Sequence, residues 1–177
     1  MTACTAVLAL SEDLKPQLLD MGICEVLLPL TDSPSIEVQG NSAAALGNLS
    51  SKADDYAPFN AVWDKPAGGL HGYLVRFLES EDTTFQHIAV WTLIQLLESG
   101  NHELEQHIRD SPHLLDLVRQ LQSRIGTFES EHEQADTSTA ADTSGQDVSP
   151  EREIAALSRR IEEILFEESD DGTSDAK

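Results

Sequence analysis

The sequence is poor in aromatic residues and in basic residues, and each shortage excludes something. Aromatic residues fill 5% of the 177 positions while 40% are hydrophobic, so the core must consist of Leu, Ile, Val and Ala, which favours helices. Only 11 Lys and Arg residues stand against 32 Asp and Glu, giving a formal net charge of −21 at pH 7. Because such a surface repels phosphates, we expect no binding to nucleic acid and no direct docking on anionic lipid.

Cysteines and long apolar runs are also scarce. Cys4 and Cys24 are the two cysteines, and they form no CxxC pair. Both occupy apolar positions of predicted helices, so we expect reduced, buried thiols rather than a disulfide framework. No apolar run approaches the roughly 18–20 residues that a membrane-spanning helix needs. These features predict a soluble protein of the cytoplasm.

The acidic residues are concentrated toward the C-terminus. Residues 127–150 contain no Lys or Arg and almost no large apolar residue, which predicts a disordered acidic linker over 127–148. An amphipathic helix is expected over 149–168, since Ile154, Leu157, Ile161 and Leu165 share one face. Residues 169–177 are expected to form a disordered tail.

The remainder of the chain repeats itself. A shift of 47 positions aligns residues 21–51 with 68–99 and pairs identical or similar residues. The matched pairs are Gly22 with Gly69, Leu27 with Leu74, Ser33 with Ser80, Gln39 with Gln86, Leu46 with Leu93 and Leu49 with Leu96. Helical units at periods of roughly 40–47 residues indicate an all-α solenoid of the HEAT or armadillo type.

The predicted solenoid covers residues 1–126 and is divided into partial and complete repeats. Its expected units are the end of a truncated repeat (1–11), two repeats (12–52 and 53–100) and a degenerate repeat (101–126). Since the chain begins with an isolated third helix, we expect it to be the C-terminal part of a longer protein, with a natural short form as the alternative. An exposed repeat face at that end predicts self-association.

The third helix of the first complete repeat has an unusual composition. It contains "SAAALGNLS" (42–50), where small residues allow neighbouring backbones to approach closely. Positions 41, 44 and 48 share one helical face, as do 87, 91 and 95 in the next repeat. An amide side chain on such a face can donate to and accept from a peptide backbone at once, and a tryptophan makes a good interface anchor.

This stretch resembles the armadillo-repeat family, whose third helix often has the form "AAxALxNLA". The resemblance implies a concave groove in which Asn48 contacts the backbone of an extended peptide from a partner protein. In the next repeat "AVWTLIQLL" (89–97) resembles the family's variant with Trp, which implies a second contact from Trp91 and Gln95, although Gln replaces the usual Asn. The predicted groove residues are therefore Asn41, Asn48, His87, Trp91 and Gln95.

Residues 1–125 resemble, more narrowly, the last repeats of the fungal vacuolar armadillo-repeat family. The similarity is closest in "IEVQGNSAAALGNLSSKADDY", "GGLHGYLVRFLES" and "FQHIAVWTLIQLLES". It implies a lipid-anchored adaptor on the vacuole surface, acting in vacuole inheritance, vacuole fusion, nucleus–vacuole contacts and autophagy. Because Thr2 replaces the Gly that myristoylation requires, we expect membrane contact only indirectly or through an anchor that this chain lacks.

Other functions are weighed against this binding module. An enzyme using Asp54, Asp55 and Asp64 is a weak hypothesis, since carboxylates are common in solvated loops, and six histidines without an HExxH pattern predict no metal site. We therefore expect no enzymatic activity, no catalytic residue and no cofactor. Within the binding class, a nuclear-import receptor that holds basic cargo is the alternative, because Trp91 precedes an amide by four residues.

The helix at 149–168 has two possible positions. It could cover the last repeat, which lacks a third helix of its own, or it could occupy the groove as an internal competitor. The missing third helix favours the covering position.

Overall fold

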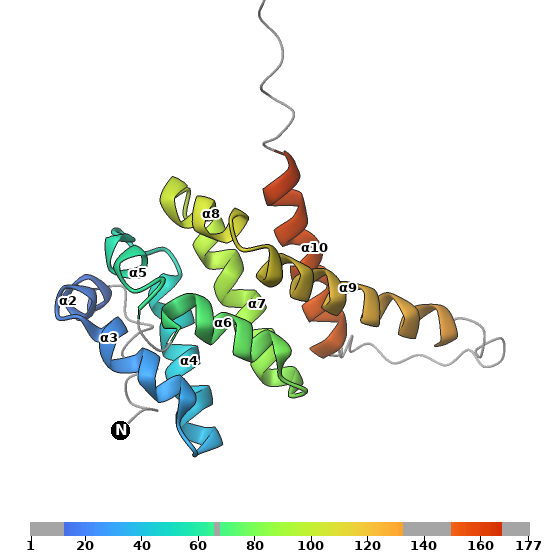
Figure 1. Cartoon of the computed structure of the whole chain (residues 1–177), viewed down its shortest axis with the longest axis horizontal. Coiled ribbons are helices and arrows are strands. Elements are labelled where there is room, and N and C mark those ends of the chain that lie inside the picture. Colours follow the sequence, from blue (N-terminus) through green and yellow to red (C-terminus); the bar gives the residue numbers. More distant parts are fainter. Residues whose placement is uncertain (1–12, 66–67, 133–149, 168–177) are drawn as a thin grey trace, which may run out of the picture.

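The computed structural model describes residues 13–65, 68–132 and 150–167, and these residues form helices joined by turns, without a β-strand (Figure 1). In chain order the elements are α2 (Lys15–Asp20), α3 (Ile23–Leu27), the 3₁₀ helix η1 (Leu28–Asp32), α4 (Ile36–Ser50), α5 (Ala57–Ala61), α6 (Gly69–Glu79), α7 (Thr83–Leu97), α8 (His102–Arg109), α9 (Pro112–His132) and α10 (Pro150–Glu167). None of these helices is long and apolar enough to cross a membrane.

The helices stack as repeats. The first described repeat consists of α2, α3 with η1, and α4; the second consists of α5, α6 and α7. Second helices pack side by side, with α6 between η1 and α9, and third helices do the same, with α4 against α7. The fold is thus the predicted all-α solenoid of stacked helical repeats.

The C-terminal helix completes the last repeat. α10 packs against α7 and α9 and runs in the same direction as α7 (Figure 1), the covering position that the missing third helix favoured. The three helices α4, α7 and α10 therefore form one row of third helices.

The repeat identities found in the sequence correspond to repeated hydrogen bonds. The side chain of Gln39, at the start of α4, donates to the carbonyl oxygen of Ser33 at 2.7 Å. Gln86, at the same place in α7, donates to the carbonyl oxygen of Ser80. Each glutamine thus closes the turn between a second and a third helix, which explains why the same residue types recur 47 positions apart.

The core is built largely from leucine, as the composition predicts, and the small-residue helix lies inside it. Ala43 and Ala45 of α4 have no exposed surface. Cys24 of α3 is 1% exposed and carries a free thiol, and burial raises its pKa to about 12. The thiol is therefore protonated at neutral pH and chemically unreactive in the folded chain.

Two boundaries differ from the prediction. The solvated loop expected around Asp54, Asp55 and Asp64 contains α5, a short helix that begins with Ala57 and Pro58 and is anchored by the fully buried Phe59. The helix α9 continues to His132, past the boundary expected at 126. The predictions for the truncated repeat at 1–11, for Cys4, for most of the acidic linker and for the tail at 169–177 lie outside the described residues.

Candidate partner-binding groove

The predicted groove residues lie on two adjacent third helices. Asn41 and Asn48 lie on α4, and His87, Trp91 and Gln95 lie on α7; all five side chains are half-buried. On both helices the positions around them are mostly buried, so these five side chains belong to the narrow accessible stripe of each helix. We call this set of five residues the candidate groove.

Local interactions fix where α7 starts. Asp82 caps the helix, because its carboxylate accepts hydrogen bonds from the backbone amides of Thr84 (2.8 Å) and Phe85 (3.2 Å). Such a cap typically stabilises a helix by about 1 kcal/mol. With the start fixed, the spacing of 3.6 residues per turn places His87, Trp91 and Gln95 on one side of the helix.

Trp91 lies across the junction between the two helices. Its six-membered ring lies against the backbone of Gly47 on α4, so closely that a Cβ atom at position 47 would lie 2.5 Å from Trp91 Cζ3. Gly47 immediately precedes Asn48, which places the indole of one repeat next to the amide-bearing turn of the other. The sequence prediction did not include Gly47, although a glycine in a helix interior, unfavourable by about 1 kcal/mol relative to alanine, was a signal of close packing.

The helix α10 borders the candidate groove on the other side of α7. Glu153 Oε1 of α10 lies 3.3 Å from His87 Nε2, an ion pair when the histidine is protonated. Further along, Arg160 of α10 pairs with Glu98, just after α7, at 3.4 Å. These contacts were missed, because the partners lie on a helix more than 60 residues further along the chain.

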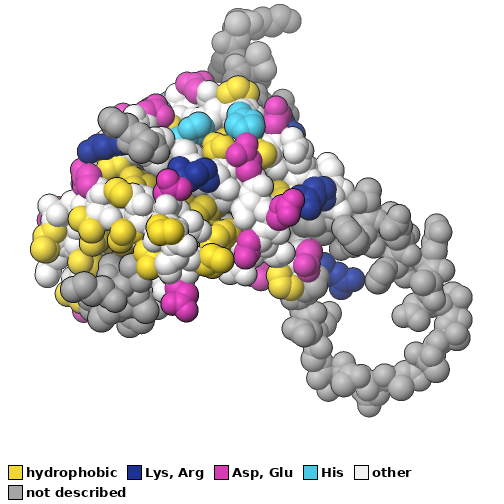
Figure 2. All heavy atoms as spheres, turned by 60° about the horizontal axis from the view of Figure 1, so that its bottom comes forward, with side chains coloured by type: hydrophobic (Ala, Val, Ile, Leu, Met, Phe, Trp, Pro, Cys, Tyr) yellow, Lys and Arg dark blue, Asp and Glu magenta, His cyan; other side chains and the backbone are white. Residues whose placement is uncertain are grey.

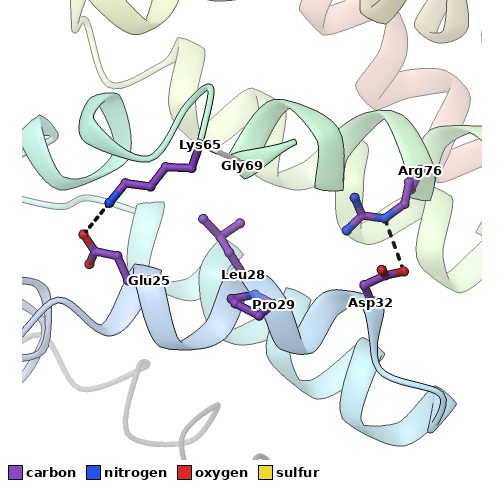
Figure 3. A pocket seen from close by; sticks show the side chains of 7 residues that line it. All are labelled: Glu25, Leu28, Pro29, Asp32, Lys65, Gly69 and Arg76. Carbon is purple, nitrogen blue, oxygen red and sulfur yellow. Dashed lines mark hydrogen bonds and ion pairs between the residues drawn. The ribbon is translucent and has the colours of Figure 1, made fainter. Parts of the chain in front are cut away.

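A concavity lies between η1 and α6, and none of the five candidate groove residues lines it (Figure 3). It has a volume of about 370 Å³ and is lined by Glu25, Leu28, Pro29, Asp32, Lys65, Gly69 and Arg76. Ion pairs stand at its two ends, Lys65 with Glu25 (3.1 Å) and Arg76 with Asp32 (3.9 Å). The hydrogen bond from Lys65 lowers the pKa of Glu25. Because the four charged groups are exposed and already paired, we interpret this concavity as a junction between repeats rather than a preformed binding site.

Exposed apolar side chains gather at the end of the molecule that carries α2 and α3 (Figure 2). Among the described residues the large exposed hydrophobic side chains are Met21, Val26 and Ile36, which are 81%, 58% and 69% exposed. Self-association was expected at the truncated repeat, residues 1–11, which lie outside the described residues, so it stays a prediction.

The acidic residues considered for catalysis, Asp54, Asp55 and Asp64, are all exposed. Asp55 accepts a hydrogen bond from the backbone amide of Ala57 and so helps to begin α5. Across the described ranges, no group of three or more His, Cys, Asp or Glu side chains is arranged to hold a metal ion.

Comparison with known proteins gives one family and a set of close relatives. The family model described as the Armadillo/beta-catenin-like repeat matches residues 11–51. Vacuolar protein 8 of Schizosaccharomyces pombe is 63% identical over 124 residues, which are 70% of this chain and 22% of the relative. For Vacuolar protein 8 of Gibberella zeae the identity is 51% over 165 residues, 93% of this chain and 27% of the relative. The Saccharomyces cerevisiae protein of the same name is 43% identical over 120 residues, 68% of this chain and 21% of the relative. The chain thus spans about a quarter of the length of the curated relatives it matches.

Proposed function

The chain is an armadillo-repeat protein similar to Vacuolar protein 8, and we propose that the candidate groove on α4 and α7 holds extended peptide segments of partner proteins. Armadillo repeats form a non-enzymatic scaffold for protein binding. The observation that carries the proposal is the half-buried Trp91, which packs on Gly47 directly before Asn48, on two third helices packed side by side.

The chemistry of these residues suits a backbone ligand. Asn48 and Gln95 each carry one carbonyl oxygen and one NH₂ group, the two kinds of group that pair with an extended peptide backbone. The two residues lie on adjacent third helices, so a peptide crossing the row would meet one amide in each repeat. Trp91 supplies the large, rigid contact area that commonly dominates the energy of protein interfaces.

The cellular setting is proposed from similarity. The relatives are named for the vacuole, and we propose that this chain acts peripherally at the vacuole membrane as part of an adaptor. Vacuole inheritance, vacuole fusion, nucleus–vacuole contact and autophagy are the processes that the family resemblance suggests. The import-receptor alternative expects a tryptophan in consecutive repeats, whereas Ala44 occupies the position of α4 that corresponds to Trp91.

The groove can be tested with a peptide obtained without assuming a partner. A random 15-residue peptide display would be selected on the full chain, and the dissociation constant of the best peptide measured by isothermal titration. Asn48→Ala combined with Trp91→Ala is expected to weaken binding at least about 30-fold, the usual effect of losing an interface tryptophan. Asn48→Ala alone, which removes no large packed group, is expected to weaken it about fivefold, comparable to the loss of one hydrogen bond.

The matched control carries His113→Ala and Gln120→Ala, two exposed residues of α9. Its affinity is expected to equal that of the unaltered chain. If the groove variants keep their helical circular dichroism and bind the peptide as tightly as the control, the proposed function is wrong.

A further inference from the structure

The helix α4 contains two glycines that face α7 in different ways. A Cβ atom at Gly40 would lie 3.5 Å from Phe85 Cε1, an ordinary contact. At Gly47 it would lie 2.5 Å and 2.9 Å from Trp91 Cζ3 and Cε3, closer than carbon atoms approach without bonding. Space for a side chain is therefore available at Gly40 and absent at Gly47.

The other neighbour of Gly47 is held in place. Thr92 Oγ1 would lie 2.8 Å from the added Cβ atom, and it donates a hydrogen bond to the carbonyl oxygen of Ile88 at 2.8 Å. Thr92 Oγ1 also lies 3.4 Å from the hydroxyl of Tyr73, a residue with no exposed surface. Because Thr92 is 1% exposed and fixed on two sides, a side chain at position 47 would displace the half-buried Trp91 instead.

We propose that Gly47 is a positioning residue for partner binding: its missing side chain lets the Trp91 indole lie on α4 directly before Asn48. This inference rests on the proposed function, because it assumes that Trp91 contacts the partner. The inference adds that the contact of Trp91 with the partner depends on both repeats, since Trp91 lies on α7 and Gly47 on α4. Gly47 sets the position of Trp91 without itself having to touch the partner.

The test follows Trp91 directly. The chain has two tryptophans, and Trp63 is 3% exposed and packs against the ring of His107, so Trp63→Phe leaves Trp91 as the only indole. In that background Gly47→Ala is compared with Gly40→Ala, which makes the same change in helix propensity on the same helix. The measurements are acrylamide quenching of Trp91 fluorescence and the dissociation constant of the display-selected peptide.

Gly47→Ala is expected to change the quenching constant about twofold and to weaken peptide binding about tenfold, the scale of one displaced interface anchor. Gly40→Ala is expected to leave both values unchanged. Should Gly47→Ala fail to fold, the double variant Gly47→Ala with Thr92→Ala removes the clash with the hydroxyl and leaves only the contact with the ring.

The outcomes separate this inference from the proposed function. If the Gly47 variants match Gly40→Ala in quenching and affinity, Gly47 does not position Trp91 and the inference is wrong, while loss of binding in Asn48→Ala would still support the groove. A change in quenching without a change in affinity would also overturn it. If neither Asn48→Ala nor Trp91→Ala weakens binding of the peptide, the proposed function itself is wrong.

Discussion

Replacing Gly69 by alanine is expected to lower the free energy of unfolding by about 2–5 kcal/mol, combining left-handed backbone strain with overpacking. Gly69 has φ +52°, a region that L-residues with a side chain rarely adopt. Its added Cβ atom would also overlap with the carbonyl oxygens of Val62 and Trp63. Both effects arise from backbone, which cannot move aside as a side chain can.

The two carbonyl groups that face Gly69, those of Val62 and Trp63, are held in place by hydrogen bonds. Val62 O accepts from the amide of Leu70 at 3.0 Å, and Trp63 O accepts from that of His71 at 3.2 Å. These bonds satisfy the first amides of α6, so moving the carbonyls would leave the start of that helix unpaired.

Gly22 is the matched control, since it is aligned with Gly69 by the internal repeat. It has φ +74°, and its added Cβ atom would approach only the side chain of Glu25, at 2.9 Å from Oε2. That exposed side chain can rotate away, so Gly22→Ala is expected to cost only the left-handed strain, about 1–2 kcal/mol. Urea denaturation followed by circular dichroism measures both variants; equal losses would show that the contact at Gly69 is not rigid.

The second large effect concerns α10. A chain that ends at residue 149 is expected to lose about 3–6 kcal/mol of stability, because α10 buries several apolar side chains, each worth about 1.5–3 kcal/mol before the cost of ordering the helix. The buried residues of α10 are Ile154, Ala155, Ser158, Ile161 and Leu165. Its removal would leave apolar surface of α7 and α9 in water.

Point substitutions distinguish packing from a general effect of truncation. Ile161→Asp places a charge at a position that is 1% exposed, so it is expected to approach the effect of the deletion. Arg159→Asp, at a neighbouring exposed position, is expected to change stability by no more than about 0.5 kcal/mol. Thermal unfolding provides the comparison. An equally stable deletion that binds the selected peptide more tightly would contradict the covering role and indicate a competitor in the groove.

The repeat could be predicted from the sequence because the features that define it are local. Gly22 ends α2, and α4 occupies Ile36–Ser50 where the small-residue pattern placed a third helix. These features depend on backbone preferences and on a spacing of 3.6 residues, which a single helix displays in its own sequence. The short helix α5 was not predicted, because five residues are too few to show a helical period. It is anchored by the packing of Phe59, which a pattern in the sequence does not display.

The candidate groove was predictable only helix by helix. Helical spacing placed Trp91 and Gln95 on one face, and Asn41 and Asn48 on another, without relating the two. The contact of Trp91 with Gly47 depends on the axial register of α4 against α7, and the pairing of His87 with Glu153 depends on where α10 packs. Such registers are set by side-chain packing between repeats, so they become visible only in three dimensions.

The central claim is that the row of third helices holds the partner chain, and site-specific photo-crosslinking tests it most directly. A benzophenone amino acid would replace Gln95 on α7 in one variant and the exposed His113 on α9 in another, each incubated with the selected peptide and irradiated. We predict a covalent adduct from position 95 and none from position 113. Adducts from position 113 with none from position 95 would place the peptide at α9 and contradict the account.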